Sequence, residues 1–270
     1  MKEFFTPSGI YYRISGPGPQ AQKTTLVFVH GLTGSASSWA EYEKALSKNF
    51  NILNLDLRGH GKSKRFKKFG EYAIVNFAED IFEITSGLGV KNFVLISHSF
   101  GTLAALEFLL RHKGMARSAV FLSPNFSADD APTAKMAGMA VKAAAKIAAI
   151  LPARTKSGRH IDYSKFPNAS DWDMKLNIAD IGNTGLRTYF FCLRHIYETD
   201  CADKWSRIDI PTLIIHGKKD TVIPARHASG MAKKIPQCEL VFMENGNHLF
   251  VINEARETIK ILEKFLDAQA

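Results

Sequence analysis

The sequence predicts an α/β fold in which a mostly parallel central sheet is covered by helices on both faces. Six short apolar runs indicate strands, at residues 25–29, 51–55, 93–96, 119–122, 212–215 and 239–243. Each run is almost continuously apolar, which is typical of strands buried on both faces. Helix-length stretches with apolar residues three and four positions apart separate most of the runs or follow the last one, as at residues 77–88, 103–110 and 259–266. Strands that alternate with helices in this way indicate a parallel sheet.

The length and composition describe an ordinary globular protein. A chain of 270 residues fits one large domain or two small ones. Hydrophobic residues make up 46% and charged residues 23%, which excludes a disordered chain. The net charge of +9 would attract phosphates and acidic headgroups, but the basic residues are spread along the chain without a nucleic-acid motif. We therefore expect no nucleic-acid partner.

Cysteine usage and the apolar pattern predict a cytoplasmic protein. The three cysteines, Cys192, Cys201 and Cys238, are odd in number and form no CxxC pair, which argues against a disulfide framework or a zinc cluster. The first residues, MKEFFTPSGIYYR, lack the apolar core and cleavage site of a secretory signal. No stretch approaches the roughly 18 uninterrupted apolar residues of a membrane-spanning helix.

One long segment interrupts the alternation of strands and helices. Residues 125–207 contain no good strand, and helical patches alternate there with loop-forming stretches. An insertion of about 80 residues is too long for a simple connection, and long excursions of this kind tend to be lids. We expect residues 1–124 and 208–270 to form the core and residues 125–207 to form a helical cap.

A basic amphipathic helix is expected within this cap, at residues 134–151. Lys135, Lys142 and Lys146 are spaced by 7 and 4 positions and so share one helical face. The favoured interpretation is a helix packed over the sheet edge with its lysines in water. The alternative is transient contact of this face with a lipid surface.

The strongest local motif is the run LISHSFG at residues 95–101, where a predicted strand meets a helix. A nucleophile on a sharp strand-to-helix turn needs small residues two positions before and after it. Centred on Ser99, these positions are Ser97 and Gly101, and both are small. Centred on Ser97, the first position would be Leu95, which is too large. Ser99 is therefore the candidate nucleophile.

Backbone donors for an oxyanion are expected beside this turn. The run at 25–29 ends in His30 and Gly31, so the chain turns sharply and the next N–H can point towards the nucleophile. The second donor in such sites is normally the N–H of the residue after the nucleophile, which is Phe100 here. The alternative is an ordinary strand-to-helix turn at His30 and Gly31.

A candidate acid and base follow the last two predicted strands. Asp220 comes after the run at 212–215, and His248 comes after the run at 239–243. The order Ser, Asp, His is the one that this sheet topology delivers. His98 lies on the other side of the nucleophile turn, His60 has no carboxylate on a neighbouring strand end, and His216 precedes the loop. His248 is therefore the expected base.

Together these motifs resemble the α/β-hydrolase superfamily over nearly the whole chain. The matching motifs are HG at 30–31, DLRGHGKS at 56–63, SHSFG at 97–101, GKKD at 217–220 and GNH at 246–248. The resemblance implies Ser99 as nucleophile, Asp220 as acid, His248 as base, and Leu32 and Phe100 as backbone oxyanion donors. It also implies a helical cap near 125–207. Ser97 stands where the family usually has glycine. Within the superfamily the chain is most similar to the monoacylglycerol lipase, lysophospholipase and carboxylesterase group.

The expected reaction is hydrolysis of a carboxylic ester through an acyl-enzyme, with no metal and no organic cofactor. Carbon–carbon bond hydrolysis with the same triad remains an alternative, as does a non-catalytic ligand-binding role. The cap carries aromatic residues, Trp172, Tyr189, Phe190 and Phe191, which suggest an apolar small-molecule substrate or else form the core of the cap itself. The sequence leaves the oligomeric state and the natural substrate open.

Overall fold

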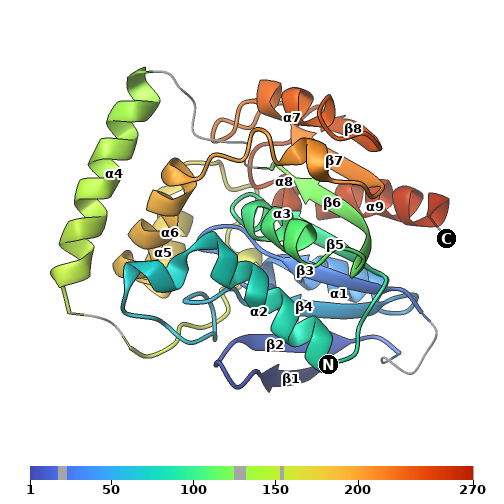
Figure 1. Ribbon diagram of the computed structural model, residues 1–270, viewed down its shortest axis with the longest axis horizontal. Helices are drawn as coiled ribbons and strands as arrows, with labels where there is room; N and C mark the ends of the chain where they lie inside the picture. Colours follow the sequence, from blue (N-terminus) through green and yellow to red (C-terminus); the bar gives the residue numbers. More distant parts are fainter. Residues whose placement is uncertain (18–22, 125–131, 153–154, 270) are drawn as a thin grey trace.

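A single mixed sheet organises the protein (Figure 1). The structure is a computed structural model that describes residues 1–17, 23–124, 132–152 and 155–269. Within these ranges, eight strands pair in the order β1-β2-β4-β3-β5-β6-β7-β8. All pairings from β4 to β8 are parallel, while β1 and β2 pair antiparallel at one edge. The predicted α/β fold with a mostly parallel sheet is confirmed.

The six predicted strands all form. The strands are β1 Lys2–Phe5, β2 Tyr11–Ser15, β3 Thr25–Val29, β4 Asn51–Leu55, β5 Phe93–His98, β6 Ala116–Leu122, β7 Thr212–Gly217 and β8 Cys238–Met243. The antiparallel hairpin of β1 and β2 was not expected from the sequence. Its outer strand is exposed at every residue, so it lacks the continuous apolar character of the central strands.

Helices cover both faces of the sheet (Figure 1). The helices are α1 Ala40–Leu46, α2 Ile74–Gly87, α3 Gly101–Arg111, α4 Pro132–Ile150, α5 Met174–Thr184, α6 Leu186–Glu198, α7 Ala225–Ala232, α8 Phe250–Asn253 and α9 Ala255–Ala268. Short 3₁₀ turns lie at Ala36–Trp39, Phe69–Tyr72, Tyr163–Lys165 and Trp205–Arg207. Among the described residues, no helix is long and apolar enough to cross a bilayer.

Two hydrophobic cores explain the continuous apolar pattern of the central strands. In β5, Phe93 and Leu95 face the core shared with α2 and α3, whereas Val94 and Ile96 face the core shared with α1 and α9. Because successive side chains of a strand point to opposite faces, every position of β5 is buried. The polar residues that follow these strands are thereby placed at the carboxyl edge of a fully covered sheet.

The helical segment between β6 and β7 lies at this edge. From 132 to 207, apart from 153–154, it contains α4, α5 and α6, and α4 packs against α6 (Figure 1). The first residues of the predicted cap, 125–131, lie outside the described residues. Lys135, Lys142 and Lys146 of α4 are exposed. We refer to the described residues 132–207 as the cap segment.

A buried ion pair fastens the loop after β4 to α2. Arg58 donates two hydrogen bonds to Asp80, from Nε at 2.8 Å and from Nη2 at 2.6 Å. Asp80 is 2% exposed. Burial raises the pKa of this carboxyl to about 6, although the contacts with Arg58 lower it. The loop that carries the DLRGHGKS motif is therefore fixed by a desolvated charge pair.

Candidate active site

Ser99 lies on a strained turn between β5 and α3. Its φ of 49° is in the left-handed region, which non-glycine residues rarely adopt. Two residues later, a Cβ on Gly101 would lie 2.4 Å from the carbonyl oxygen of His30 and 2.9 Å from that of Val29. Only glycine allows α3 to start this close to β3. At the other small position, Ser97 is fully buried, and its hydroxyl has no hydrogen-bond partner within the described chain.

The structure brings the predicted serine, histidine and aspartate together in one hydrogen-bonded chain. Nε2 of His248 lies 2.9 Å from Oγ of Ser99, and Nδ1 lies 2.8 Å from Oδ2 of Asp220. An ionised carboxylate only accepts hydrogen bonds, so the Nδ1–H donates to Asp220. Nε2 of the neutral ring is then free to accept the Ser99 proton. This is the geometry of a nucleophile, a base and an orienting acid.

Asp220 is held in its ionised form. Its Oδ1 accepts hydrogen bonds from the N–H groups of Val222 at 2.9 Å and Ile223 at 2.7 Å. Burial raises the pKa of this carboxyl, but the hydrogen bond and charge interaction with His248 outweigh that effect and leave the pKa at about 2. His216, a rejected candidate base, instead donates from Nε2 to the carbonyl of Ile223 at 2.9 Å.

His30 shapes the turn that faces Ser99. Its Nε2 accepts a hydrogen bond from the N–H of Leu57 at 2.9 Å, so the proton of the neutral ring is on Nδ1, which donates to the Gly31 carbonyl at 2.7 Å. Burial lowers the pKa of His30 to about 4, which keeps the ring neutral. A Cβ on Gly31 would lie 3.2 Å from Cβ of Ser99, so this turn packs directly against the nucleophile.

The predicted oxyanion donors lie at this contact. Leu32 follows the Gly31 turn, and Phe100 follows Ser99 as the residue before α3. In the part of the chain that the structure describes, neither backbone N–H donates a hydrogen bond to a protein group. Two unpaired N–H groups beside a serine can stabilise a negative oxygen that forms during the reaction.

His98, a rejected candidate base, contacts the loop that carries His248. Its Nε2 lies 3.0 Å from the carbonyl oxygen of His248. Burial, and then the nearby His248, lower the pKa of His98 to about 3, so the ring is neutral and donates from Nε2 to this carbonyl. The contact fixes the loop after β8.

Sequence reasoning missed Asp171, which connects the two loops of the triad. Its Oδ1 accepts the N–H of His248 at 2.7 Å, and its Oδ2 accepts the N–H and the hydroxyl of Thr221 at 2.9 and 2.7 Å. Thr221 directly follows Asp220. Asp171 belongs to the cap segment, so the insertion itself holds the loops that carry Asp220 and His248. No spacing in the sequence signals this contact.

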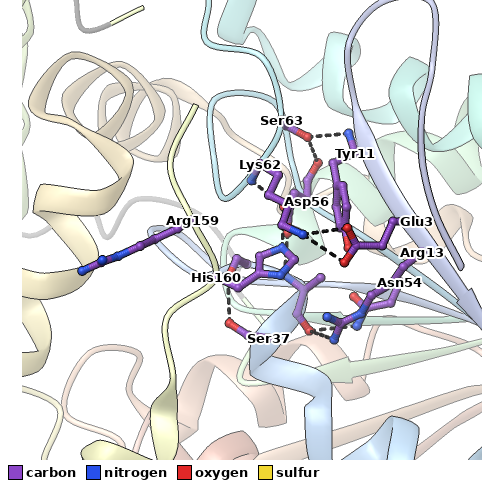
Figure 2. A network of polar contacts seen from close by, with 12 residues as sticks. Glu3, Tyr11, Arg13, Ser37, Asn54, Asp56, Lys62, Ser63, Arg159 and His160 are labelled. Atoms are coloured by element: carbon purple, nitrogen blue, oxygen red, sulfur yellow. Dashed lines mark hydrogen bonds and ion pairs between the residues drawn. The ribbon is translucent and has the colours of Figure 1, made fainter. Parts of the chain in front are cut away.

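A second buried aspartate joins the cap segment to the core (Figure 2). Asp56 follows β4 and is completely buried. Its Oδ1 accepts the N–H of Ala36 at 2.6 Å, and its Oδ2 accepts the N–H of Lys62 at 2.7 Å and Nε2–H of His160 at 2.9 Å. Burial raises the pKa of Asp56, but the contacts with His160 outweigh it and the pKa is lowered. This network was also missed, because His160 lies in the insertion.

A cavity of about 550 Å³ has Ser99, Asp171 and His248 in its wall. It is lined by the core residues Leu32, Ser99 and His248 and by cap residues that include Tyr163, Leu176 and Asp180. A second cavity of about 690 Å³ lies between the cap segment and Arg65 and Phe66 of the core. It shares Trp172, Asn177 and Tyr189 with the first. Across the described ranges, no group of three or more His, Cys, Asp and Glu side chains is placed to hold a metal ion.

The cap aromatics divide between the two interpretations of the sequence. Trp172 and Tyr189 line both cavities. Phe191 is buried in the main core, and Phe190 packs against that core. Half of this aromatic set therefore faces space that a ligand can occupy.

Comparisons with known proteins agree with this arrangement. Residues 24–255 match the family described as alpha/beta hydrolase fold. A putative carbamate hydrolase, RutD, from Pseudomonas syringae is 26% identical over 268 residues, covering 92% of this chain and 96% of that protein. The 3-oxoadipate enol-lactonase 1 of Acinetobacter baylyi is 26% identical, covering 94% of this chain and 91% of that protein.

Solved structures share the fold at lower identity. A thermophilic esterase from Thermogutta terrifontis superimposes with a TM-score of 0.76 at 19% identity, covering 99% of this chain and 98% of that one. At this identity the likeness establishes the fold alone. The match to the family itself covers most of the chain and includes all three members of the hydrogen-bonded triad. The chain belongs to the family of the alpha/beta hydrolase fold, and this membership supports hydrolase activity.

Proposed function

We propose that the protein is a serine hydrolase that cleaves small, largely apolar carboxylic esters through an acyl-enzyme. The observation that carries the proposal is the hydrogen-bonded chain from Ser99 through His248 to Asp220. It lies beside two unpaired backbone N–H groups at the end of a cavity. No other feature of the described chain combines a positioned nucleophile, a base and donors for an oxyanion.

In the first step, Oγ of Ser99 attacks the ester carbonyl carbon while Nε2 of His248 takes the hydroxyl proton. Asp220 stabilises the imidazolium that forms. The carbonyl oxygen becomes an oxyanion that accepts hydrogen bonds from the N–H groups of Leu32 and Phe100. Each such donor lowers the barrier by roughly 3–4 kcal/mol. The tetrahedral intermediate then expels the alcohol, which receives the proton from His248.

In the second step, water replaces the alcohol. His248 takes a proton from the water as its oxygen attacks the acyl carbon. The same N–H donors hold the second oxyanion. Collapse of this intermediate releases the carboxylic acid and returns the proton to Ser99. The residues of the chain supply every proton transfer in this cycle.

The cavity supports an ester of modest size with apolar parts. Leu176, Leu193 and Ile196 of the cap and Val251 and Ile252 after β8 line it. The two relatives are named for a carbamate and an enol-lactone, and both substrates present a carbonyl carbon bonded to oxygen or nitrogen. Attack by Ser99 on such a carbon is the same first step. Lactones and carbamates are therefore the nearest alternatives to open-chain esters.

We further propose that residues 125–207 act as a cap over the site. The contacts of Asp171 with the triad loops and of His160 with Asp56 support this proposal. The exposed lysines of α4 are available to a lipid surface, and transient contact with lipid stays a prediction of the sequence. A cytoplasmic location stays a prediction of the sequence.

The test is hydrolysis of p-nitrophenyl esters from acetate to palmitate, with a γ-lactone and a phenyl carbamate measured in parallel. Ser99→Ala is the inactive variant, and Ser86→Ala, an exposed serine of α2, is the matched control. We expect turnover by the wild type and by Ser86→Ala, a short- to medium-chain optimum, and none by Ser99→Ala. If Ser99→Ala keeps full activity, the proposal is wrong. If the folded wild type cleaves no ester, lactone or carbamate, carbon–carbon hydrolysis or ligand binding becomes the better account.

A further inference from the structure

A buried carboxyl from the cap lies in the same cavity as the nucleophile. Leu176, Asp180 and Thr184 are spaced by four residues on α5 and form its buried face. Asp180 is 8% exposed and lines the cavity that contains Ser99 and His248. An acidic residue on the buried face of a helix is costly unless it has a partner. The proposed reaction assigns no role to this side chain.

Asp180 has one protein partner among the described residues. The hydroxyl of Tyr163 donates to its Oδ1 at 3.3 Å, and Tyr163 is itself 8% exposed. Within the described chain, Oδ2 has no hydrogen-bond partner and no basic side chain forms an ion pair with Asp180. Burial raises the pKa of this carboxyl to about 7, and the Tyr163 hydroxyl only partly opposes that effect. One carboxyl oxygen is therefore left to pair with a ligand.

The helix that carries Asp180 also contacts the turn that carries Leu32. One helical turn further along α5, the hydroxyl of Thr184 donates to the carbonyl of Thr33 at 3.2 Å. Thr33 follows Leu32, which carries a proposed oxyanion donor. The side chain of Asp180 is thus on the order of 6 Å from that of Thr184, whose hydrogen bond holds α5 against the turn that carries Leu32. A substrate whose carbonyl lies at this turn shares the cavity with Asp180.

The surroundings of this carboxyl are apolar. Tyr163 and Leu176 belong to a small hydrophobic cluster, against which Leu249 and Ile252 pack. These residues also line the cavity. Of the titratable residues in the cavity wall, Tyr163 is the one in contact with Asp180. The others that line the cavity are His98, Asp171, Tyr189, Tyr197, His227 and His248.

We propose that Asp180 and Tyr163 form a polar subsite that selects substrates with a neutral hydroxyl group close to the scissile ester bond. This inference rests on the proposed ester hydrolysis and specifies its substrate class. A hydroxyl can donate to an ionised Asp180 and can accept from a protonated one, so it pairs with the carboxyl in both forms. An alkyl group in the same place leaves Oδ2 of the carboxyl buried without a hydrogen-bond partner, which disfavours that substrate.

The test compares substrates that differ only by a hydroxyl and a methyl group. On the alcohol side the pair is 2-hydroxyethyl butyrate and propyl butyrate. On the acyl side it is propyl 3-hydroxybutyrate and propyl 3-methylbutyrate. A third pair, butyrylcholine and 3,3-dimethylbutyl butyrate, compares a cation with its neutral isostere. The readout is the ratio of kcat/KM within each pair, in which pH effects common to both substrates cancel.

We expect the hydroxyl substrate of one pair to be favoured about tenfold, the order expected for one hydrogen bond to a buried polar group. Asp180→Leu should abolish this preference, because kcat/KM for the hydroxyl substrate should fall relative to that for the methyl substrate. Asp180→Asn should retain a preference, because an amide both donates and accepts. Asp203→Asn is the matched control, since Asp203 belongs to the same cap segment but is exposed.

The pH dependence of the ratio separates a ligand contact from a purely structural role. The ionised carboxylate accepts a stronger, charge-assisted hydrogen bond. The wild-type ratio should therefore rise as pH increases through about 7, and it should be flat in Asp180→Asn. This comparison needs only the conservative variant, so it stands even if Asp180→Leu does not fold.

The outcomes separate the two proposals. If Ser99→Ala is inactive but wild type shows ratios near one in both hydroxyl pairs, the subsite is refuted and ester hydrolysis stands. An unchanged preference in Asp180→Leu refutes it as well. A larger preference for butyrylcholine than for either hydroxyl substrate would show that the subsite binds cations. If no ester is cleaved at all, the proposed function itself has failed.

Discussion

Replacing Gly101 with alanine tests how closely activity depends on the packing of the nucleophile turn. The added Cβ would lie 2.4 Å from the carbonyl oxygen of His30 and 2.9 Å from that of Val29. Both neighbours are backbone atoms at the end of β3, a central strand paired on both sides. Lengthening the shorter of these distances from 2.4 Å to 3.0 Å, which is still a tight contact, requires a shift of about 0.6 Å. Because neither neighbour is a flexible side chain, α3 must move.

The expected losses follow from that displacement. Overpacking of this kind costs about 1–3 kcal/mol, against which the higher helix propensity of alanine returns about 0.5–1 kcal/mol. The shift also displaces Ser99 and the Phe100 N–H from the turn that carries Leu32. Loss of one oxyanion donor lowers kcat by roughly 100- to 1000-fold. We expect Gly101→Ala to be modestly destabilised and to lose at least about 100-fold in kcat.

The assay is hydrolysis of p-nitrophenyl butyrate together with urea unfolding of the same preparations. Gly230→Ala is the matched control, because Gly230 lies inside α7 and a Cβ there would meet nothing within 4 Å. This control should gain about 0.5–1 kcal/mol in unfolding free energy and keep full activity. If Gly101→Ala retains kcat within threefold of wild type, the reasoning about the turn is refuted.

Three further predictions concern buried charges. Asp220→Asn should lower kcat about 10⁴-fold at pH 7 with the fold intact, because the imidazole of His248 loses the acceptor that fixes its tautomer; near-normal ester turnover would contradict this. Arg58→Met should lower the unfolding free energy, measured in urea, by about 3–5 kcal/mol at pH 8, because it leaves the buried carboxylate of Asp80 without its partner. The loss should be smaller at pH 5, where Asp80 can be protonated. Equal losses at both pH values would argue against a buried charge. The pKa of Asp180 lies near 7, above its ordinary value of 3.8. The contribution of this residue to the unfolding free energy is therefore fully present below about pH 3.8 and is lost as pH rises through 7. The unfolding free energy of Asp180→Asn relative to wild type, measured in urea, should therefore rise by about 4 kcal/mol between pH 4 and pH 9. A difference that does not change with pH would show that Asp180 does not carry a buried charge.

The central strands could be predicted because their environment leaves a simple pattern. A strand with helices on both faces, such as β5, is apolar at nearly every position. The edge hairpin could not be recognised this way, since β1 is exposed and owes its place to pairing with β2. Cross-strand pairing of Phe4 with Tyr12 stabilises that hairpin, but a sequence does not reveal which residues will face each other.

The residues of the candidate site likewise include some that the sequence predicts and some that it does not. Ser99, Asp220 and His248 each follow one of the parallel strands of the same sheet, so the topology alone predicts that they meet. Asp171 and Asp180 lie in the insertion, where no sheet dictates the position of a residue. Their contacts arise from the way the insertion folds back onto the core, and a single sequence carries no periodic signal for that.

The most direct test of the central claim is covalent labelling of the nucleophile with diethyl p-nitrophenyl phosphate, followed by intact-protein and peptide mass spectrometry. A serine activated by His248 should release p-nitrophenol and take up one diethylphosphoryl group per chain, located on Ser99. His248→Ala should label far more slowly, and Ser86→Ala should label like wild type. Labelling on another residue, or equal labelling of Ser99→Ala, would contradict the account.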